Sequence, residues 1–376
     1  MSDDNQIQNI PMASPEISEE DVQAVLEVVR SGRLALGPKT KEFENAIAEY
    51  VGVRHAVAVS SGTAALHLIV RAMGIGPGDE VLVPSFTFAA SVNAIIYEGA
   101  KPVFVDIDPE TYNLDPEDLE QKITERTKAI MAVDIFGHPA EWDEITSIAD
   151  KHGLRVIDDS CEALGAEYKG RKIGQFGDAA TFAFYPNKQM TTGEGGIIVT
   201  DDSEIARQAR SMRNQGRGEM GAWLTHERLG YNYRMDEMSA ALGVSQLSRI
   251  DTFVSKRAGV AQIYTNKLEP FPWIRTPVVK PYVRMSWFVY VVTLAEGLER
   301  DAVIEKLDAA GIPARGYFAP IHTQPYIREL LGPDIEPLPV TELVARRTIA
   351  LPFHNNLSEL QIEAVVGALR DAVQYS

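Results

Sequence analysis

The feature that most constrains the fold is a regular alternation of short apolar runs and amphipathic segments through the first half of the chain. The expected strands are Ala56–Ser60, Glu80–Pro84, Pro102–Asp106, Ala129–Asp134 and Leu154–Asp158, and the expected helices between them are Ala64–Met73, Ala89–Tyr97, Pro116–Lys122 and Trp142–His152. Repeated strand–helix–strand units of this length are typical of a largely parallel sheet covered by helices on both faces. We therefore predict an α/β fold whose ligands gather beyond the carboxyl ends of the strands.

The segment Ala179–Thr200 places one lysine, Lys188, in a loop between two further expected strands. An apolar run at Ala180–Tyr185 leads into Pro186, and a Thr/Gly stretch separates Lys188 from a β-branched run at Ile197–Thr200. Proline and glycine on either side favour a loop, and desolvation by apolar strands disfavours a charged ammonium. A neutral amine attacks carbonyl carbons, so Lys188 is a candidate for a Schiff base with an aldehyde cofactor. A surface-turn lysine would show the same local pattern.

Two other expected strands also end in groups that suit a ligand. Gly62 and Thr63 follow the strand Ala56–Ser60 and begin a helix, whose N-terminus offers free N–H groups to an anion, although an ordinary helix cap would look the same. Asp158 and Asp159 close a buried strand, where a carboxylate needs a positive partner such as a protonated pyridine nitrogen. A cap for the next segment or a pair with an arginine remains an alternative for the two acids. The strand-end rule brings together Gly62, Thr63, Phe88, Asp159 and Lys188.

Composition excludes several classes of function. The formal net charge of −17 argues against a general nucleic-acid binder, because phosphate contacts need a basic face. The single cysteine, Cys161, excludes an intrachain disulfide framework and a Cys-rich metal site, and no metal is expected. No apolar run approaches the roughly 20 residues that span a bilayer, and Met1–Ile10 lacks a signal-peptide core. These features predict a cytoplasmic enzyme with no membrane partner.

The length of 376 residues suits one large and one small domain. We predict a large domain over residues 14–248 and a small domain over 249–376, with residues 1–13 flexible. Ser18 and Gly32 are expected to cap an early helix, with an apolar stripe formed by Val22, Val25, Leu26 and Val29. Beyond residue 200 we expect strands at Phe288–Leu294 and Pro313–Pro320, and helices at Asp202–Arg210, Asp236–Ile250, Arg300–Ala310 and Ser358–Val373.

Several segments, taken in order, carry a resemblance to a known family. They are SGRLALGPKTKEFE, SSGTAALHL, VPSFTFAAS, KPVFVDIDPETYNLDP, DIFGHPAEWD, VIDDSCEALGAEYKGRKIGQFGDAATFAFYPNKQMTTGEGG, RNQGR and LGYNYRMDEMSAALGVSQL. From about Ile17 to its end, the chain resembles the DegT/DnrJ/StrS-type sugar-nucleotide aminotransferases, which are fold-type I enzymes that use pyridoxal 5′-phosphate (PLP). The similarity is greatest to the branch that includes the GDP-perosamine synthases. These enzymes aminate C4 of a 4-keto-6-deoxy sugar nucleotide.

The resemblance implies roles for individual residues of this chain. Lys188 would bind the cofactor covalently and then carry the proton, and Asp159 would pair with the pyridine nitrogen. Phe88 would stack on the cofactor ring, while Gly62 and Thr63 would hold its phosphate. The remaining implied contacts are Glu162 near the phenolic oxygen, Asn232 on the phosphate of the neighbouring subunit of a homodimer, and Arg33, Leu34, Arg234, Tyr317, Phe318 and His322 around the substrates.

One position departs from the family pattern, because Ala183 stands where the family usually has a phosphate-binding serine. Phosphate binding would then depend more on the other contacts, or on a water. The function implied is transfer of an amino group from an amino acid, expected to be L-glutamate, to the C4 keto group of a nucleotide-linked 4-keto-6-deoxy sugar. Two alternatives remain open: amination of a cyclitol ketone of the scyllo-inosose type, and a non-catalytic regulatory protein on the same fold. His322 beside Pro320 suits a structural role as well as a sugar contact, and Arg234 suits either the donor carboxylate or an ion pair.

Overall fold

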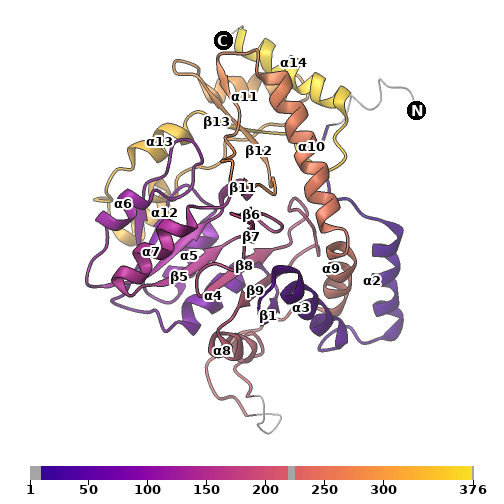
Figure 1. Ribbon diagram of the computed structural model, residues 1–376, viewed down its shortest axis with the longest axis vertical. Coiled ribbons are helices and arrows are strands. Elements are labelled where there is room, and N and C mark those ends of the chain that lie inside the picture. Colours follow the sequence, from indigo (N-terminus) through magenta and orange to yellow (C-terminus); the bar gives the residue numbers. More distant parts are fainter. Residues whose placement is uncertain (1–9, 219–224, 375–376) are drawn as a thin grey trace.

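A seven-stranded sheet forms the centre of the molecule (Figure 1), in a computed structural model that describes residues 10–218 and 225–374. The strand order is β1-β9-β8-β5-β4-β2-β3. The strands are β1 His55–Val59, β2 Glu80–Pro84, β3 Lys101–Val105, β4 Thr127–Val133, β5 Arg155–Asp159, β8 Ala179–Ala183 and β9 Gly196–Thr200. Strand β9 runs antiparallel to both of its neighbours, and all other pairs are parallel. The predicted α/β class with a mainly parallel sheet is confirmed.

Helices cover both faces of this sheet. The helices of this part of the chain are α2 Glu19–Ser31, α3 Pro38–Val51, α4 Gly62–Ala72, α5 Ala89–Tyr97, α6 Pro116–Gln121, α7 Trp142–His152, α8 Ser203–Arg213 and α9 Glu237–Leu247. In β1, Ala56 and Ala58 belong to the core cluster that includes α3 and α7, while Val57 and Val59 belong to the cluster that includes α4, α5 and α8. Burial on both faces explains why the strands read as nearly continuous apolar runs.

A smaller unit follows α10 (Ile250–Leu268), the long helix on the right of Figure 1. Its sheet has the order β10-β12-β13, and a third sheet has the order β11-β6-β7. The remaining elements are β6 Glu167–Tyr168, β7 Arg171–Lys172, β10 Ile274–Arg275, β11 Val283–Arg284, β12 Tyr290–Leu294, β13 Thr348–Leu351, α11 Arg300–Ala309, α12 Pro325–Leu331, α13 Pro339–Ala345, α14 Glu359–Gln374 and the 3₁₀ turns η1 Ile135–Gly137 and η2 Ile321–Thr323.

The helix α10 belongs to both hydrophobic cores. Ile250, Phe253 and Val254 pack in a core cluster of the large sheet, whereas the second half of the helix packs against β12, β13 and α14. The division at residue 248 therefore stays a prediction. Ile10 is buried in the core of the smaller unit, and the Phe353 N–H donates to the Met12 carbonyl. These two residues contact the smaller core, residues 1–9 lie outside the described residues, and the flexibility expected for residues 1–13 stays a prediction.

Two expectations for local structure are wrong. Ser18 and Gly32 do cap α2, but the buried residues of that helix are Asp21 and Val28, while Val22 and Val29 are about half exposed. Asp21 faces the protein interior because its carboxylate accepts hydrogen bonds from Ser245, Gln246 and Arg249. These residues lie in α9 and in the turn after it.

The predicted strand Pro313–Pro320 holds only one isolated bridge, between Arg315 and Ala350, whereas the strand that pairs with β12 is β13. Prolines 313 and 320 lack the N–H groups that a strand would contribute. Within residues 10–218 and 225–374, no helix is both long and apolar enough to cross a membrane.

Candidate active site

Lys188 lies in the loop after β8, as expected, with its side chain only 13% exposed. The Lys188 N–H donates to the Tyr185 carbonyl at 2.9 Å, which closes a tight turn after Pro186. Its Nζ lies 3.8 Å from the centre of the Phe288 ring and 3.7 Å from Oε1 of Glu162. An amine on an aromatic face with one carboxylate at long range is held in place with few strong bonds.

Asp159 ends β5 and is 5% exposed. Its Oδ2 accepts a hydrogen bond from the Ser91 hydroxyl at 2.6 Å, and its Oδ1 accepts one from the Cys161 N–H at 3.2 Å. No lysine, arginine or histidine of the described ranges lies within ion-pair distance of this carboxylate. Asp159 is therefore a buried acid that protein dipoles orient but no protein cation neutralises.

The side chain of Glu162 is buried and reaches Lys188 from the turn that follows Asp159. Its Oε2 accepts from the Phe136 N–H at 2.8 Å. Burial raises the pKa of Glu162, and the nearby charge of Lys188 opposes that rise only in part. Burial likewise raises the pKa of the Cys161 thiol, with Asp159 adding to the effect.

The N-terminus of α4 faces the same group of residues. Ser61 caps the helix by accepting the Ala64 N–H, which leaves the N–H groups of Gly62 and Thr63 with no protein acceptor in the described part of the chain. A Cβ on Gly62 would lie 2.9 Å from both the Ala183 Cβ and the Cys161 Sγ. The helix start, the end of β8 and the turn after β5 thus meet at one point, and only glycine fits there.

Two further buried carboxyl groups, those of Asp134 and Asp158, share a hydrogen-bonding partner next to Asp159. The Ser160 hydroxyl contacts Asp158 and, at 3.1 Å, Asp134, and both acids are fully buried. Burial raises the pKa of Asp134 to about 6, and burial together with the neighbouring Asp134 raises the pKa of Asp158 well above its usual range. Asp134 and Asp158 therefore disfavour each other's ionisation, whereas Asp159 accepts its hydrogen bonds from Ser91 and Cys161.

Sequence reasoning missed Arg257, which is fully buried on α10. Its guanidinium donates to the carbonyl of Lys188 at 2.9 Å and to the carbonyls of Trp287 and Phe288 at 3.1 Å each. It thereby holds the main chain of Lys188 and of the residue whose ring covers Nζ. The sequence pattern that could have indicated Arg257 is an arginine on the apolar face of an amphipathic helix, four residues after Phe253.

The structure brings some of the other expected contact residues toward this site. Tyr317 and Phe318 stack on Phe136, which itself bonds Glu162, so they border the site. Phe88 immediately precedes α5 and is 64% exposed, with its ring free to cover a ligand. His322 instead has Nδ1 bonded to Ser85 at 2.7 Å and Nε2 to Glu342 at 3.3 Å, which fits the structural alternative.

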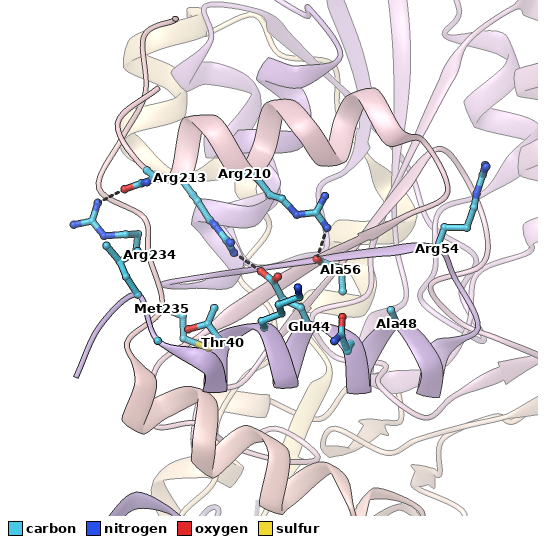
Figure 2. A pocket seen from close by; sticks show the side chains of 14 residues that line it. Thr40, Glu44, Ala48, Arg54, Ala56, Arg210, Arg213, Arg234 and Met235 are labelled. Carbon is cyan, nitrogen blue, oxygen red and sulfur yellow. Dashed lines mark hydrogen bonds and ion pairs between the residues drawn. The ribbon is translucent and has the colours of Figure 1, made fainter. Parts of the chain in front are cut away.

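Other expected residues lie apart from Lys188 within one chain. Arg33 and Leu34 are exposed in the loop after α2. Asn232 is exposed between Tyr231 and Tyr233, whose rings stack on each other 4.9 Å apart and pack on His67. Arg234 donates to Asn214 at 3.0 Å and lines a separate cavity between α3 and α8 (Figure 2), whose lining includes neither Lys188 nor Asp159.

Comparisons with known proteins identify a family over almost the whole chain. The profile described as the DegT/DnrJ/EryC1/StrS aminotransferase family matches residues 15–370. A GDP-perosamine synthase from Caulobacter vibrioides is 43% identical over 368 residues, covering 96% of this chain and 97% of the relative. A dTDP-3-amino-3,4,6-trideoxy-alpha-D-glucose transaminase from Streptomyces venezuelae is 38% identical over 366 residues, covering 96% and 94%. The PLP form of Spr1654, a proposed sugar aminotransferase from Streptococcus pneumoniae, is 30% identical with a TM-score of 0.92, covering 98% and 99%.

Proposed function

The chain belongs to the DegT/DnrJ/EryC1/StrS aminotransferase family of PLP-dependent enzymes, and from this premise we propose its substrates and the roles of its residues. The amino acceptor is the C4 keto group of a nucleotide-linked 4-keto-6-deoxy sugar, and the donor is L-glutamate. One observation carries the proposal. Lys188 follows β8, and Asp159, a buried acid with no cation in ion-pair distance among the described residues, ends the neighbouring strand β5. The similarity to a GDP-perosamine synthase supports the sugar class and C4.

The residues present fit PLP at three points. Asp159 has a buried carboxylate with no protein cation, which suits a protonated ring nitrogen. The free N–H groups of Gly62 and Thr63 at the start of α4 suit the phosphate. The Nζ of Lys188 suits the aldehyde carbon, because its nearest carboxylate, Glu162, is 3.7 Å away and its side chain is largely shielded from water.

When bound, PLP supplies a conjugated ring that takes up electrons from the Cα–H bond of the amino donor. Asp159 keeps a proton on the ring nitrogen, which that electron uptake requires. Lys188 would act as the base that removes the Cα proton of the donor and as the acid that delivers it again. Phe88, through its exposed ring, and Glu162, beside Lys188, would help to hold the cofactor. The donor and acceptor use the same site in turn, which produces ping-pong kinetics.

We also propose that two chains build each site. Asn232 is exposed beside the stacked Tyr231 and Tyr233, which leaves it free to reach the phosphate held by a partner subunit. Apolar side chains on and near α2, at the outer edge of Figure 1, are 44% exposed or more: Ile17, Val22, Val29, Leu34 and Leu36. Exposed apolar groups gathered in this way favour a subunit contact.

The function is tested by following the two half-reactions separately. PLP-loaded protein is mixed with L-glutamate, and loss of the yellow absorbance reports transfer of the amino group to the cofactor. The amino form is then mixed with a panel of nucleotide-linked 4-keto sugars and with scyllo-inosose. Return of the yellow form with a 4-keto sugar nucleotide supports the proposal. Return with the cyclitol alone contradicts the substrate class, and absence of any response to glutamate in PLP-loaded protein contradicts the donor.

A further inference from the structure

A cavity of 540 Å³ lies between α3 and α8, along the free edge of β1 (Figure 2). Five cationic residues and one carboxylate, Glu44, line it. The cations are Lys41, Arg54, Arg210, Arg213 and Arg234. This local excess of positive charge stands against a net charge of −17 for the whole chain.

Part of the basic lining has a structural role. Arg213 pairs with Glu44 and donates to the Ala58 carbonyl, while Glu44 accepts the Ala58 N–H at 3.0 Å. These two side chains therefore cover the hydrogen-bonding groups that β1 exposes as an edge strand. Arg54 pairs with Asp201 at 3.5 Å, at the end of the cavity opposite Arg234 (Figure 2).

Three cations remain after these pairs are removed: Lys41, Arg210 and Arg234. No carboxylate in the described part of the chain lies within ion-pair distance of any of them. Arg210 donates to the Ala56 carbonyl at 3.2 Å, and Arg234 donates to the Asn214 side chain, so neutral acceptors hold both guanidinium groups. The first N–H groups of α3 are already bonded to Glu237 and add nothing to the cavity.

The cavity cations also affect His55, a neighbouring residue at the start of β1. Its pKa is lowered, first by burial and then by the charges of Arg210 and Arg54, although Asp201 and Asp202 act in the opposite direction. An arginine fork matches the oxygen atoms of a phosphate, and Arg210 and Arg213 lie one turn apart on the same helix.

We propose that this cavity binds a small molecule that carries a diphosphate group, at a second anion site separate from the one that holds Lys188. Three unneutralised cations match the charge of a diphosphate better than that of a single phosphate. The cavity volume is within the range of sites that hold a whole nucleotide-sized ligand. Occupancy would add a regulatory input to the enzyme, because Asn214 lines the cavity and forms an isolated bridge with Asn232.

The test is calorimetric titration of PLP-loaded protein with inorganic pyrophosphate and, in a second arm, with GDP. Arg210→Gln should weaken pyrophosphate binding about tenfold, because it removes a charge-assisted contact. Lys41→Gln, at an exposed position that leaves folding intact, should weaken it by a smaller factor. Arg207→Gln is the matched control on α8, because Arg207 pairs with Glu204 and does not line the cavity.

Each outcome decides the proposal. Loss of affinity in the Arg210 and Lys41 variants, with Arg207→Gln unchanged, supports it, and tighter binding of GDP than of pyrophosphate by the unaltered protein, lost in the same variants, places the nucleoside in the cavity. Equal affinity for the two probes assigns the site to the diphosphate group alone. Unchanged pyrophosphate affinity in both variants overturns the proposal, because the anion then binds elsewhere. The proposal is also overturned if the Arg210 and Lys41 variants change the dissociation of the subunits but not the affinity for pyrophosphate. In that case the cavity is a contact between subunits.

Discussion

Arg257→Met tests whether a buried arginine holds the lysine loop in place. The substitution removes three hydrogen bonds of 3.1 Å or less, to the carbonyls of Lys188, Trp287 and Phe288. Bonds from a charged donor contribute about 1.5–3 kcal/mol each, so the gross loss is roughly 5–9 kcal/mol. Against this, burial lowers the pKa of Arg257 to about 10, and removing that desolvated charge returns about 3 kcal/mol.

The net expectation is a loss of roughly 2–6 kcal/mol in the free energy of unfolding, because the hydrogen bonds outweigh the desolvation. The assay is urea unfolding of PLP-free protein, with kcat of the PLP-loaded protein as a second readout. Turnover should fall even though Lys188 is intact, since its main chain and the Phe288 ring over Nζ both lose their anchor. Lys256→Met is the charge-matched control, because Lys256 forms a partly exposed pair with Glu16 and should cost about 1 kcal/mol or less. If Arg257→Met unfolds at the same urea concentration as the unaltered protein, the reasoning is refuted.

Three further predictions address the carboxyl pair, the phosphate and the partner subunit. The pKa of Asp134 is raised from 3.8 to about 6, so the folded state holds the extra proton, and stability falls by about 3 kcal/mol as pH rises from about 4 to 6. Asp134→Asn should make that part of the urea-midpoint profile shallower and leave the contribution of Asp158, and an unchanged profile would count against the buried pair. Ala183→Ser places a hydroxyl beside Gly62 and should tighten PLP binding about tenfold in equilibrium dialysis, with equal or weaker binding as the contrary result. Asn232→Ala should lose activity alone, yet regain it when mixed with Lys188→Ala chains, because one hybrid site then keeps both residues; no regain would refute the shared site.

The parts of the fold that follow from local pattern could be predicted from the sequence. Glu80–Pro84, Ala89–Tyr97 and Trp142–His152 have the predicted bounds, because apolar periodicity and flanking glycine or proline mark their ends. The positions of Lys188 and Asp159 followed from the rule that ligands gather at carboxyl strand ends.

Features that depend on distant contacts could not be predicted in this way. Asp21 turns α2 inward because polar groups more than 200 residues later receive its carboxylate. Arg257 bonds the Lys188 carbonyl from α10, far along the chain. The position of β13 depends on its pairing with β12 and not on a local sequence pattern. The cavity between α3 and α8 could not be predicted from the sequence either, because its cations come from four separate segments.

The most direct test of the account is a mass measurement at Lys188. PLP-loaded protein is reduced with borohydride and digested, and the peptides are analysed for the added mass of the reduced cofactor. The account predicts that the label is on the peptide containing Lys188, and that Lys188→Ala retains PLP only without a covalent bond and has no turnover. A label on another lysine, or unlabelled Lys188 in protein that still holds PLP, would contradict it.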